Sequence, residues 1–463
     1  MSINAQDVAR QQSPALAIAL PRAAANDSRL RRWHHLSVRF KFTLTLSLSI
    51  GWAVCLFHLT QHWVRQLGAL EGSLLAHLMM VVIAILPGAM NAFFFVGLLL
   101  DRRPPRSRFA DSDYPGVTLL IAAYNEETSI LSTLESIDRQ SYPGPLEVLV
   151  INDGSTDDTM GRLRSVSYPW LHVIDLKCNG GKAKALNNGL RHAAYPVTVT
   201  LDASAYLYRD ALRRLVERFM SDPPNTAAVA GTVMVRNSRQ SLVTQLQEWD
   251  YFHGVAASKR LQSLFQGTLV AQSALSLYRT DILRVVGGWP ECAGEDTVLT
   301  WAILRDAHRV GYCEDAIAFT RVPSTLDALV NRRRRASRGL YEAFKAHGIL
   351  LLQPRMSTLF VWWSLLLPTV QLAYTLLLVP CLLLACAGVW SLAAPIVLLT
   401  LPVALLANGL MYLIQSRMYR AQGLTVRRNR LGLLLYTVLY GLVLRPGGAI
   451  GHASGLLKRY RSW

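Results

Sequence analysis

Two apolar stretches near the start of the chain, at residues 42–61 and 74–100, most constrain its possible folds. Each has about the length that an α-helix needs to cross a bilayer, at roughly 1.5 Å of rise per residue. Pro87 lies inside the second stretch, so we expect a kink there. Because 51% of the 463 residues are hydrophobic, membrane-spanning segments are the first architecture to consider.

Basic residues flank these two stretches and predict their orientation. Lysine and arginine are dense before the first and after the second, whereas the loop expected between them carries only Arg65. By the positive-inside rule, the N-terminal tail and everything after Asp101 are cytoplasmic. The net charge of +18 then reflects membrane-flanking loops or a surface for anionic nucleotide substrates, and nucleic acid is not an expected partner.

The C-terminal part of the chain returns to an apolar composition. Residues 359–389 and 392–414 are long apolar runs, and 431–444 is short for a full span with basic residues on both sides. We therefore expect a polar, disordered tail (1–38), two transmembrane helices (39–101) and a cytoplasmic domain (111–348). An interfacial helix and two to three membrane segments, the last re-entrant or irregular, would occupy 349–463.

Between the membrane regions, strands and helices alternate. Apolar runs with strand character occur at 116–124, 146–153, 172–175, 197–202 and 227–233, separated by amphipathic stretches. Repeated β-α-β units predict a parallel, doubly wound, Rossmann-like α/β sheet. Ligands bind beyond the carboxyl ends of the strands in such sheets. Polar clusters at 125–127, 152–155 and 202–204 follow three of these ends.

The most specific motif is V-L-V-I-N-D-G-S-T-D-D-T at 148–159. A buried strand ends in Asn152 and Asp153, and a turn glycine follows. Ser155 or Thr156 is expected to cap a helix whose first turn carries two acids. A well-capped strand-to-helix turn would explain the same residues without any ligand.

Three weaker motifs add to it. N-G-G-K-A-K-A-L-N at 179–187 is a glycine-rich loop that opens a helix with Lys182, which suits a diphosphate. The run V-T-V-T-L-D ends in Asp202, but Ser204 stands where such sites usually carry a second acid. Glu295 and Asp296 begin a helix, where they either complement the helix dipole or provide a general base for a substrate hydroxyl.

The order of these motifs between membrane stretches resembles the family 2 inverting glycosyltransferases. More narrowly, it resembles the processive membrane polysaccharide synthases that make cellulose, chitin, hyaluronan and poly-N-acetylglucosamine. The membrane layout is most similar to that of the bacterial poly-β-1,6-N-acetylglucosamine synthases. The resemblance covers roughly residues 40–460 and implies a GT-A fold for the cytoplasmic domain, inserted between transmembrane helices.

The resemblance also implies a role for each matching position. Asp296, beside Glu295, would be the catalytic base that takes the proton of the acceptor hydroxyl during a single inverting displacement. Asp202 would hold Mg²⁺ or Mn²⁺, which stabilises the leaving diphosphate. The residues expected to bind the nucleotide sugar are Tyr124, Glu126, Asp153, Lys182 and Asp202.

Two departures from the family pattern fall on the metal and the acceptor. Ser204 replaces the second metal-binding carboxylate, and a neutral hydroxyl coordinates Mg²⁺ only weakly. Gln272 and Ser273 stand where the family carries Ser-Gly in a loop near the acceptor sugar. Altered acceptor or donor fit is expected.

A third departure affects the Q-x-x-R-W motif of the family. Aligned on Gly339, Arg332 takes the Gln position, Arg335 the Arg position and Ala336 the Trp position. The missing Trp removes a stacking platform for the sugar chain. The run 332–335 could neutralise the donor diphosphate or contact anionic lipid, and the sequence leaves both interpretations open.

The implied function is transfer of a sugar from a UDP-sugar, best UDP-N-acetylglucosamine, to a growing polysaccharide. Export across the bacterial inner membrane for exopolysaccharide and biofilm formation would be coupled to it. The expected partners are the donor, the acceptor chain, inner-membrane lipid and a small membrane or periplasmic subunit. The substitutions also fit an alternative, a weak or inactive paralogue that is a scaffold subunit of a polysaccharide synthesis complex. A transporter fits poorly, because few ionisable residues lie inside the apolar runs.

Overall fold

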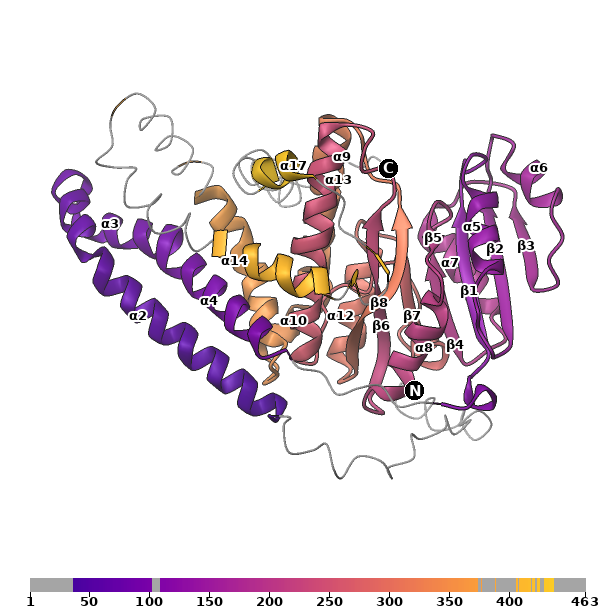
Figure 1. Cartoon of the computed structure of the whole chain (residues 1–463), viewed down its shortest axis with the longest axis horizontal. Helices are drawn as coiled ribbons and strands as arrows, with labels where there is room; N and C mark the ends of the chain where they lie inside the picture. Colours follow the sequence, from indigo (N-terminus) through magenta and orange to yellow (C-terminus); the bar gives the residue numbers. More distant parts are fainter. Residues whose placement is uncertain are drawn as a thin grey trace, which may run out of the picture.

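The computed structural model describes residues 36–101 and 109–373, together with short pieces between 376 and 436. Figure 1 shows a pair of long helices beside an α/β domain built on one large sheet. The predicted N-terminal tail, apart from its last three residues, and most of the predicted C-terminal membrane segments lie outside the described residues.

The helical pair matches the two apolar stretches of the sequence. Its first helix is α2 (Val38–Glu71), and the second is formed by α3 (Ser73–Met80), the π-helical turn η3 (Val81–Ile85) and α4 (Leu86–Leu99). The segments Val38–Arg65 and Ser73–Leu99 are long and apolar enough to cross a membrane. Large apolar side chains such as Ile50 and Leu74 are exposed, as expected for a surface in contact with lipid.

Two details of this pair differ from the sequence prediction. Helix α2 continues to Glu71, so Arg65 lies inside the helix and Gly72, with a φ of 93°, forms the connection alone. The irregularity expected at Pro87 lies just before it, in the π-helical turn η3. Proline has no N–H to donate and its ring crowds the preceding turn, which disturbs the helix on the N-terminal side.

The domain is built on an eight-stranded sheet in the order β3-β2-β1-β4-β7-β6-β8-β5. The neighbours β3, β2, β1 and β4 are parallel, as predicted. However, β7 is antiparallel to both β4 and β6, and β5 is antiparallel to β8. The strands are β1 (Val117–Ala123), β2 (Leu146–Asp153), β3 (Leu171–Leu176), β4 (Val197–Leu201), β5 (Tyr206–Leu207), β6 (Thr226–Val235), β7 (Leu275–Arg279) and β8 (Arg309–Thr320).

The sheet is therefore mixed rather than wholly parallel, with its parallel half on the β3 side. The predicted strands had not included β7, although its residues 275–278 are fully buried between β4 and β6. The short stretch L-S-L-Y is buried on both faces, and its composition does not reveal the direction in which the strand runs.

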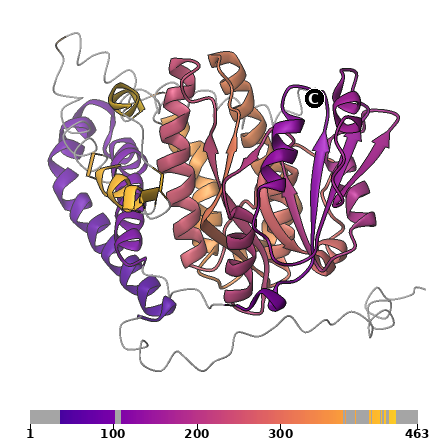
Figure 2. The same cartoon turned by 45° about the vertical axis from the view of Figure 1, so that its right-hand side comes forward.

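Helices cover both faces of the sheet (Figures 1 and 2). Leu119 and Ile121 of β1 pack into the core on the side of α5 and α8, and Leu120 packs into the core on the side of α7 and α12. The helices are α5 (Ile130–Asp138), α6 (Thr159–Arg164), α7 (Lys182–His192), α8 (Ala211–Ser221), α9 (Leu242–Trp249), α10 (Ala256–Leu264), α11 (Thr280–Val285), α12 (Glu295–Arg305) and α13 (Leu326–His347).

Several shorter helical segments are also present in the described chain. They are the 3₁₀ turns η4 (Asp111–Asp113) and η6 (Gly348–Leu352), the π-helical turn η5 (Asp250–Val255), α14 (Thr358–Ala373) and α17 (Arg430–Leu435). Helices α9, η5 and α10 follow one another without a break. The described part of α14, Thr358–Ala373, is shorter than a full membrane span.

The helical pair is attached to the domain through α10. A Cβ atom on Gly97 of α4 would lie 2.4 Å from Cδ1 of Leu261, so the two helices approach closely at this glycine. Next to this contact, Arg260 forms an ion pair with Asp101, whose side chain is only 1% exposed. Phe93 of α4 also packs its ring 5.5 Å from that of Phe265. Helix α10 therefore connects the helical pair to the sheet.

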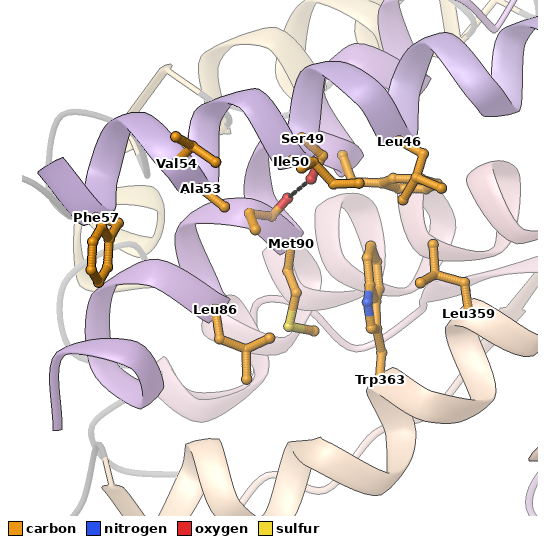
Figure 3. Close-up of a pocket in the computed structure, with 12 residues that line it drawn as sticks. Leu46, Ser49, Ile50, Ala53, Val54, Phe57, Leu86, Met90, Leu359 and Trp363 are labelled. Atoms are coloured by element: carbon orange, nitrogen blue, oxygen red, sulfur yellow. Dashed lines mark hydrogen bonds between the residues drawn. The ribbon is translucent and has the colours of Figure 1, made fainter. Parts of the chain in front are cut away.

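An apolar recess of about 360 Å³ lies between α2, α4 and α14 (Figure 3). Ser49 donates a hydrogen bond to the carbonyl of Ala89 at 2.5 Å across the helical pair. Met90 and Trp363 lie on its wall. This recess is lined by the helical pair and α14 and contains none of the predicted site residues.

Candidate active site

The parallel strands β1, β2 and β4 end at one edge of the sheet, as their in-register pairing requires. Asp153 is the last residue of β2, Asp202 directly follows β4, and Tyr124 directly follows β1, with Glu126 two residues on. Tyr124 is 45% exposed. The three predicted polar clusters therefore share one edge.

Asp153 joins two motifs that are separate in the sequence. The residue is 2% exposed, and its carboxylate accepts the backbone N–H groups of Gly180 at 2.9 Å and Gly181 at 2.8 Å. Gly154 permits this approach, because its φ is 67° and a Cβ there would lie 2.7 Å from the backbone nitrogen of Asn179. A cavity of about 410 Å³ borders Asp153 and Gly180.

The predicted cap of the helix after β2 is wrong. Helix α6 begins at Thr159 with Asp158 in the N-cap position, so neither Ser155 nor Thr156 caps it. The acid Asp157 lies before the helix and accepts a hydrogen bond from the Thr159 backbone at 3.0 Å. The first turn of α6 consequently contains no acid.

Ser155 instead connects the loops after β1 and β2. Its hydroxyl donates to Oδ1 of Asn152 at 2.6 Å and accepts the backbone N–H of Asn125 at 3.0 Å. The backbone N–H of Thr156 donates to Oδ1 of Asn125 at 2.8 Å. Because these partners lie across the loop, tertiary contacts replace the local cap that the sequence suggested.

Lys182 is the centre of a charged cluster. Its Nζ donates to Oδ1 of Asp202 and to the hydroxyl of Ser273, both at 2.5 Å. Ser273 Oγ also lies 3.5 Å from Asp202 Oδ1. Burial by itself lowers the pKa of Lys182, but the carboxylates of Asp202 and Asp296 outweigh it and hold the pKa above its ordinary value. Lys182 is therefore cationic at the strand edge.

Asp296 lies opposite this cluster in the first turn of α12. Its Oδ2 accepts the backbone N–H of Ser273 at 2.8 Å, whereas its Oδ1 is buried without a hydrogen-bond partner among the described residues. Burial raises the pKa of Asp296 to about 7, Glu295 adds to the rise and Lys182 opposes it. A carboxylate with one uncommitted oxygen and a pKa near neutrality can accept a proton from a bound hydroxyl.

Glu126 belongs to the same electrostatic neighbourhood. Burial raises its pKa, the Ser129 hydroxyl opposes this rise, and Asp202 adds to it through space. Arg321, just after β8, acts on Glu126 in the opposite direction. Glu126 therefore lies near the lysine cluster, as the predicted donor site requires.

Gln272 takes a place different from that of its neighbour Ser273. Its side-chain Oε1 accepts from Nζ of Lys259, and its Nε2 donates to the carbonyl of Gly231 at 3.2 Å. Both ends of the amide are thus engaged inside the protein. Ser273 contacts Lys182 directly, whereas Gln272 supports the loop from behind.

The arginine run 332–335 lies on α13, and its arginines make different contacts. Arg332 donates to the hydroxyl of Tyr251 at 2.5 Å and stands 5.7 Å from the centre of its ring. Arg333 forms an ion pair with Asp250 in the adjoining turn η5. Arg335 is exposed and forms no ion pair with any described residue. The structure therefore attaches Arg332, but not Arg335, to the domain.

Sequence reasoning missed two residues near this cluster, Lys259 and Tyr251. Lys259 is 7% exposed and interacts electrostatically with Asp296. The pKa of Tyr251 is raised mainly by burial; the charge of Arg332 opposes this rise and the charge of Asp202 adds to it. A lysine among Ala256, Ala257 and Leu261 on the buried side of α10 was a signal that the sequence contained.

The residues fit a divalent cation only through Asp202. It offers one carboxylate, one oxygen of which is bonded to Lys182, and Ser204 adds a neutral hydroxyl at most. Within the part of the chain that the structure describes, no three His, Cys, Asp or Glu side chains group as metal ligands. Any Mg²⁺ or Mn²⁺ here would take most of its ligands from a bound diphosphate and water.

A mixed Rossmann-like sheet, acids at the ends of β2 and β4, a lysine at the glycine-rich loop and a buried acid opposite them are the arrangement expected of a GT-A fold. Residues 115–339 match the family model described as glycosyltransferase-like family 2. This part of the chain, just under half of its length, is therefore similar to the family 2 glycosyltransferases.

Two relatives are similar to this chain in sequence. The chain is 29% identical over 270 residues to a poly-β-1,6-N-acetyl-D-glucosamine synthase of Staphylococcus epidermidis, covering 55% of this chain and 64% of the relative. It is 31% identical over 229 residues to the synthase of Staphylococcus aureus strain COL, covering 49% and 55%. The alignments thus span 55–64% of the length of these relatives.

The fold resembles that of a mannosyltransferase from Pyrobaculum calidifontis in complex with GDP-mannose and Mn²⁺. The TM-score is 0.54 at 20% sequence identity, and the match covers 83% of this chain and 100% of that one. At this identity the likeness concerns the fold.

Proposed function

We propose that this chain is a membrane polysaccharide synthase that transfers a sugar from a UDP-sugar to a growing polysaccharide with inversion. UDP-N-acetylglucosamine is the best candidate donor, because the relatives that the sequence matches are poly-β-1,6-N-acetyl-D-glucosamine synthases. The observation that carries the proposal is the placement of Asp296 opposite the Lys182–Asp202 pair.

The proposed mechanism assigns each side of the cluster a task. The open oxygen of Asp296 accepts the proton of the acceptor hydroxyl while the hydroxyl attacks the anomeric carbon. Lys182 places positive charge where the diphosphate leaves, so that negative charge developing there is stabilised. Asp202 would hold Mg²⁺ or Mn²⁺, and the cation would supply further charge to the leaving diphosphate. Tyr124, Glu126 and Asp153 surround the nucleoside end.

The helical pair supports a membrane location for the enzyme. Its two helices are long and apolar enough to cross a bilayer, and α10 attaches them to the domain that carries the site. We infer that the protein lies in the bacterial inner membrane with its catalytic domain in the cytoplasm. Synthesis would then deliver the polymer toward the membrane for export as an exopolysaccharide of biofilms, with an additional small subunit as a candidate partner.

A donor panel tests the proposal on the purified full-length protein. Radiolabelled UDP-sugars are supplied with Mg²⁺ or Mn²⁺ in detergent, and the product is analysed for sugar and linkage. Incorporation from UDP-N-acetylglucosamine into polymer is expected. If no UDP-sugar is bound or turned over with any divalent cation, the enzymatic proposal is wrong.

The alternative is a weak or inactive paralogue that is a scaffold subunit of a polysaccharide synthesis complex. Ser204 in place of an acid and Ala336 in place of a Trp favour it. Donor binding without turnover, combined with co-purification of an active glycosyltransferase, would support this alternative.

A further inference from the structure

Lys259 is a buried lysine that none of the motifs explains. It lies in α10 with 7% of its surface exposed, and the other buried residues of this helix are alanine, leucine and serine. Its Nζ donates to the neutral amide of Gln272 and forms no ion pair with any described residue. Burying an ammonium group is costly unless a nearby negative charge compensates for it.

The hydrogen bonds of Gln272 lead from Lys259 to the site. The Gln272 amide joins Lys259 to the carbonyl of Gly231, and its own backbone carbonyl accepts the Ser276 hydroxyl at 2.7 Å. The following residue, Ser273, donates its N–H to Oδ2 of Asp296 at 2.8 Å. Lys259 therefore hydrogen-bonds to Gln272, which directly precedes Ser273, and the N–H of Ser273 donates to Asp296.

The carboxylate of Asp296 also acts on Lys259 through space, because it opposes the fall in the pKa of Lys259 that burial causes. The other charged groups facing Asp296 are Glu295, Lys182 and Asp202, and the buried hydroxyl of Tyr278 lies nearby. Lys182 is already paired with Asp202 at 2.5 Å. Lys259 is therefore a second positive charge that interacts with Asp296 through space, and it forms no ion pair with any described residue.

We propose that Lys259 is a positioning residue for the transfer reaction. Through Gln272 it holds the Ser273 N–H on Asp296, and its charge favours the ionised form of that carboxylate. This role rests on the proposed function, in which Asp296 is the base.

The effect of the Lys259 charge on the ionisation of Asp296 is expected near neutral pH. Burial lowers the pKa of Lys259 to about 7, and Asp296 opposes this fall. Burial raises the pKa of Asp296 to about 7 as well. Both groups are therefore expected to change charge near neutral pH. At and below neutral pH the ammonium stabilises the carboxylate, and removing it shifts proton release from Asp296 to higher pH.

Two variants of the full-length protein separate charge from positioning. Lys259→Met removes the charge and the hydrogen bond, whereas Gln272→Met removes the hydrogen bond and leaves the charge. Lys345→Met, an exposed lysine of α13, is the control. The readouts are kcat and KM for the donor as functions of pH.

Lys259→Met should move the acid limb of the kcat profile up by about one pH unit, as expected for loss of one close opposite charge. Gln272→Met should lower kcat by roughly tenfold through misplacement of the loop, with no upward shift of that limb. An unchanged limb in Lys259→Met, whether or not kcat falls, would overturn the role of the charge.

A measurement without turnover separates this inference from the proposed function. Thermal midpoints of wild type, Lys259→Met, Asp296→Asn and the double variant are measured near neutral pH in detergent. The two effects should be non-additive by about 2 °C or more. Additive midpoints in folded variants would overturn the pairing. If wild type turns over no donor while the midpoints remain non-additive, the proposed function fails and the pairing stands.

Discussion

Gly294 and Gly339 are in direct contact: a Cβ atom built on Gly339 would lie 2.6 Å from the Cα of Gly294. Gly294 precedes the helix that begins with Glu295 and Asp296, and its φ is 76°. Gly339 belongs to α13, the helix that carries the arginine run. Because neither glycine has a side chain, α13, which carries the arginine run, can approach the start of α12, which carries the proposed base Asp296.

Gly339→Ala should impair the enzyme through this contact. The new methyl group meets backbone atoms that cannot rotate away, so α13 or the start of α12 must shift. A misplacement of about 1 Å costs on the order of 10²-fold in rate, and we expect a loss of kcat of at least tenfold. Steady-state rates and thermal midpoints would be compared with Gly348→Ala, where the added Cβ has no neighbour within 4 Å. Equal rates for both variants would show that the contact is not critical.

Asp296→Asn should abolish transfer while sparing the donor. A positioned general base contributes about 10²–10⁴-fold, and the asparagine oxygen can still accept the Ser273 N–H. Transfer rates and calorimetric binding of UDP provide the two measurements. Turnover at the wild-type rate would remove Asp296 from the role of base.

The pH profile of the wild-type enzyme follows from the same residue. A base acts in its ionised form, and the pKa of Asp296 is raised to about 7. The rate should therefore be high above neutral pH and fall as the pH drops through about 7. A profile that is flat down to pH 5 would contradict this assignment, provided that the protein remains folded there.

The raised pKa of Asp296 also has a stability consequence. The ordinary value of the carboxyl is 3.8, so between this pH and about 7 the folded state binds more protons than the unfolded state. Stability from this group is thus present at low pH and is lost as the pH rises through that window. Asp296→Asn should raise the thermal midpoint above pH 7 relative to wild type, and the gain should vanish near pH 4. A gain of the same size at both pH values would indicate another cause.

Lys182→Met should weaken the donor site more than Lys184→Met. Lys182 contacts Asp202 and Ser273, whereas Lys184 pairs with the exposed Glu291 at 3.3 Å. We expect kcat/KM for the donor to fall by roughly 10²-fold in the first variant and by far less in the second. Similar losses in both would indicate a general effect of charge on α7.

Ser204→Asp should restore a second carboxylate at the metal site. With two acids, the half-saturating Mn²⁺ concentration in the transfer assay should fall by roughly tenfold. Ser204→Asn is the control, since it changes size without adding charge. If metal dependence is the same in all three proteins, the cation binds in an arrangement that does not include position 204.

Parts of the fold could be predicted from the sequence because buried strands have runs of apolar residues. Strands β1, β2 and β4 are apolar runs that end in polar residues, and the predicted boundaries lie close to those observed. The direction of β7 could not be read, because buried strands of either direction have the same composition. The cap at Ser155 failed since a partner 30 residues away, Asn125, competes for the same hydroxyl.

The sequence by itself determined which chemical groups the site contains: the acids at 153, 202 and 296, Lys182 at the glycine-rich loop, and the absence of an acid at 204. The tertiary structure decided how they act on one another. Lys259 and Gln272 are 13 residues apart and Lys182 and Ser273 are 91 apart, so only packing of α10 and the β7 loop against the sheet brings them together. Charge interactions depend on distance and burial, and neither quantity is present in a linear sequence.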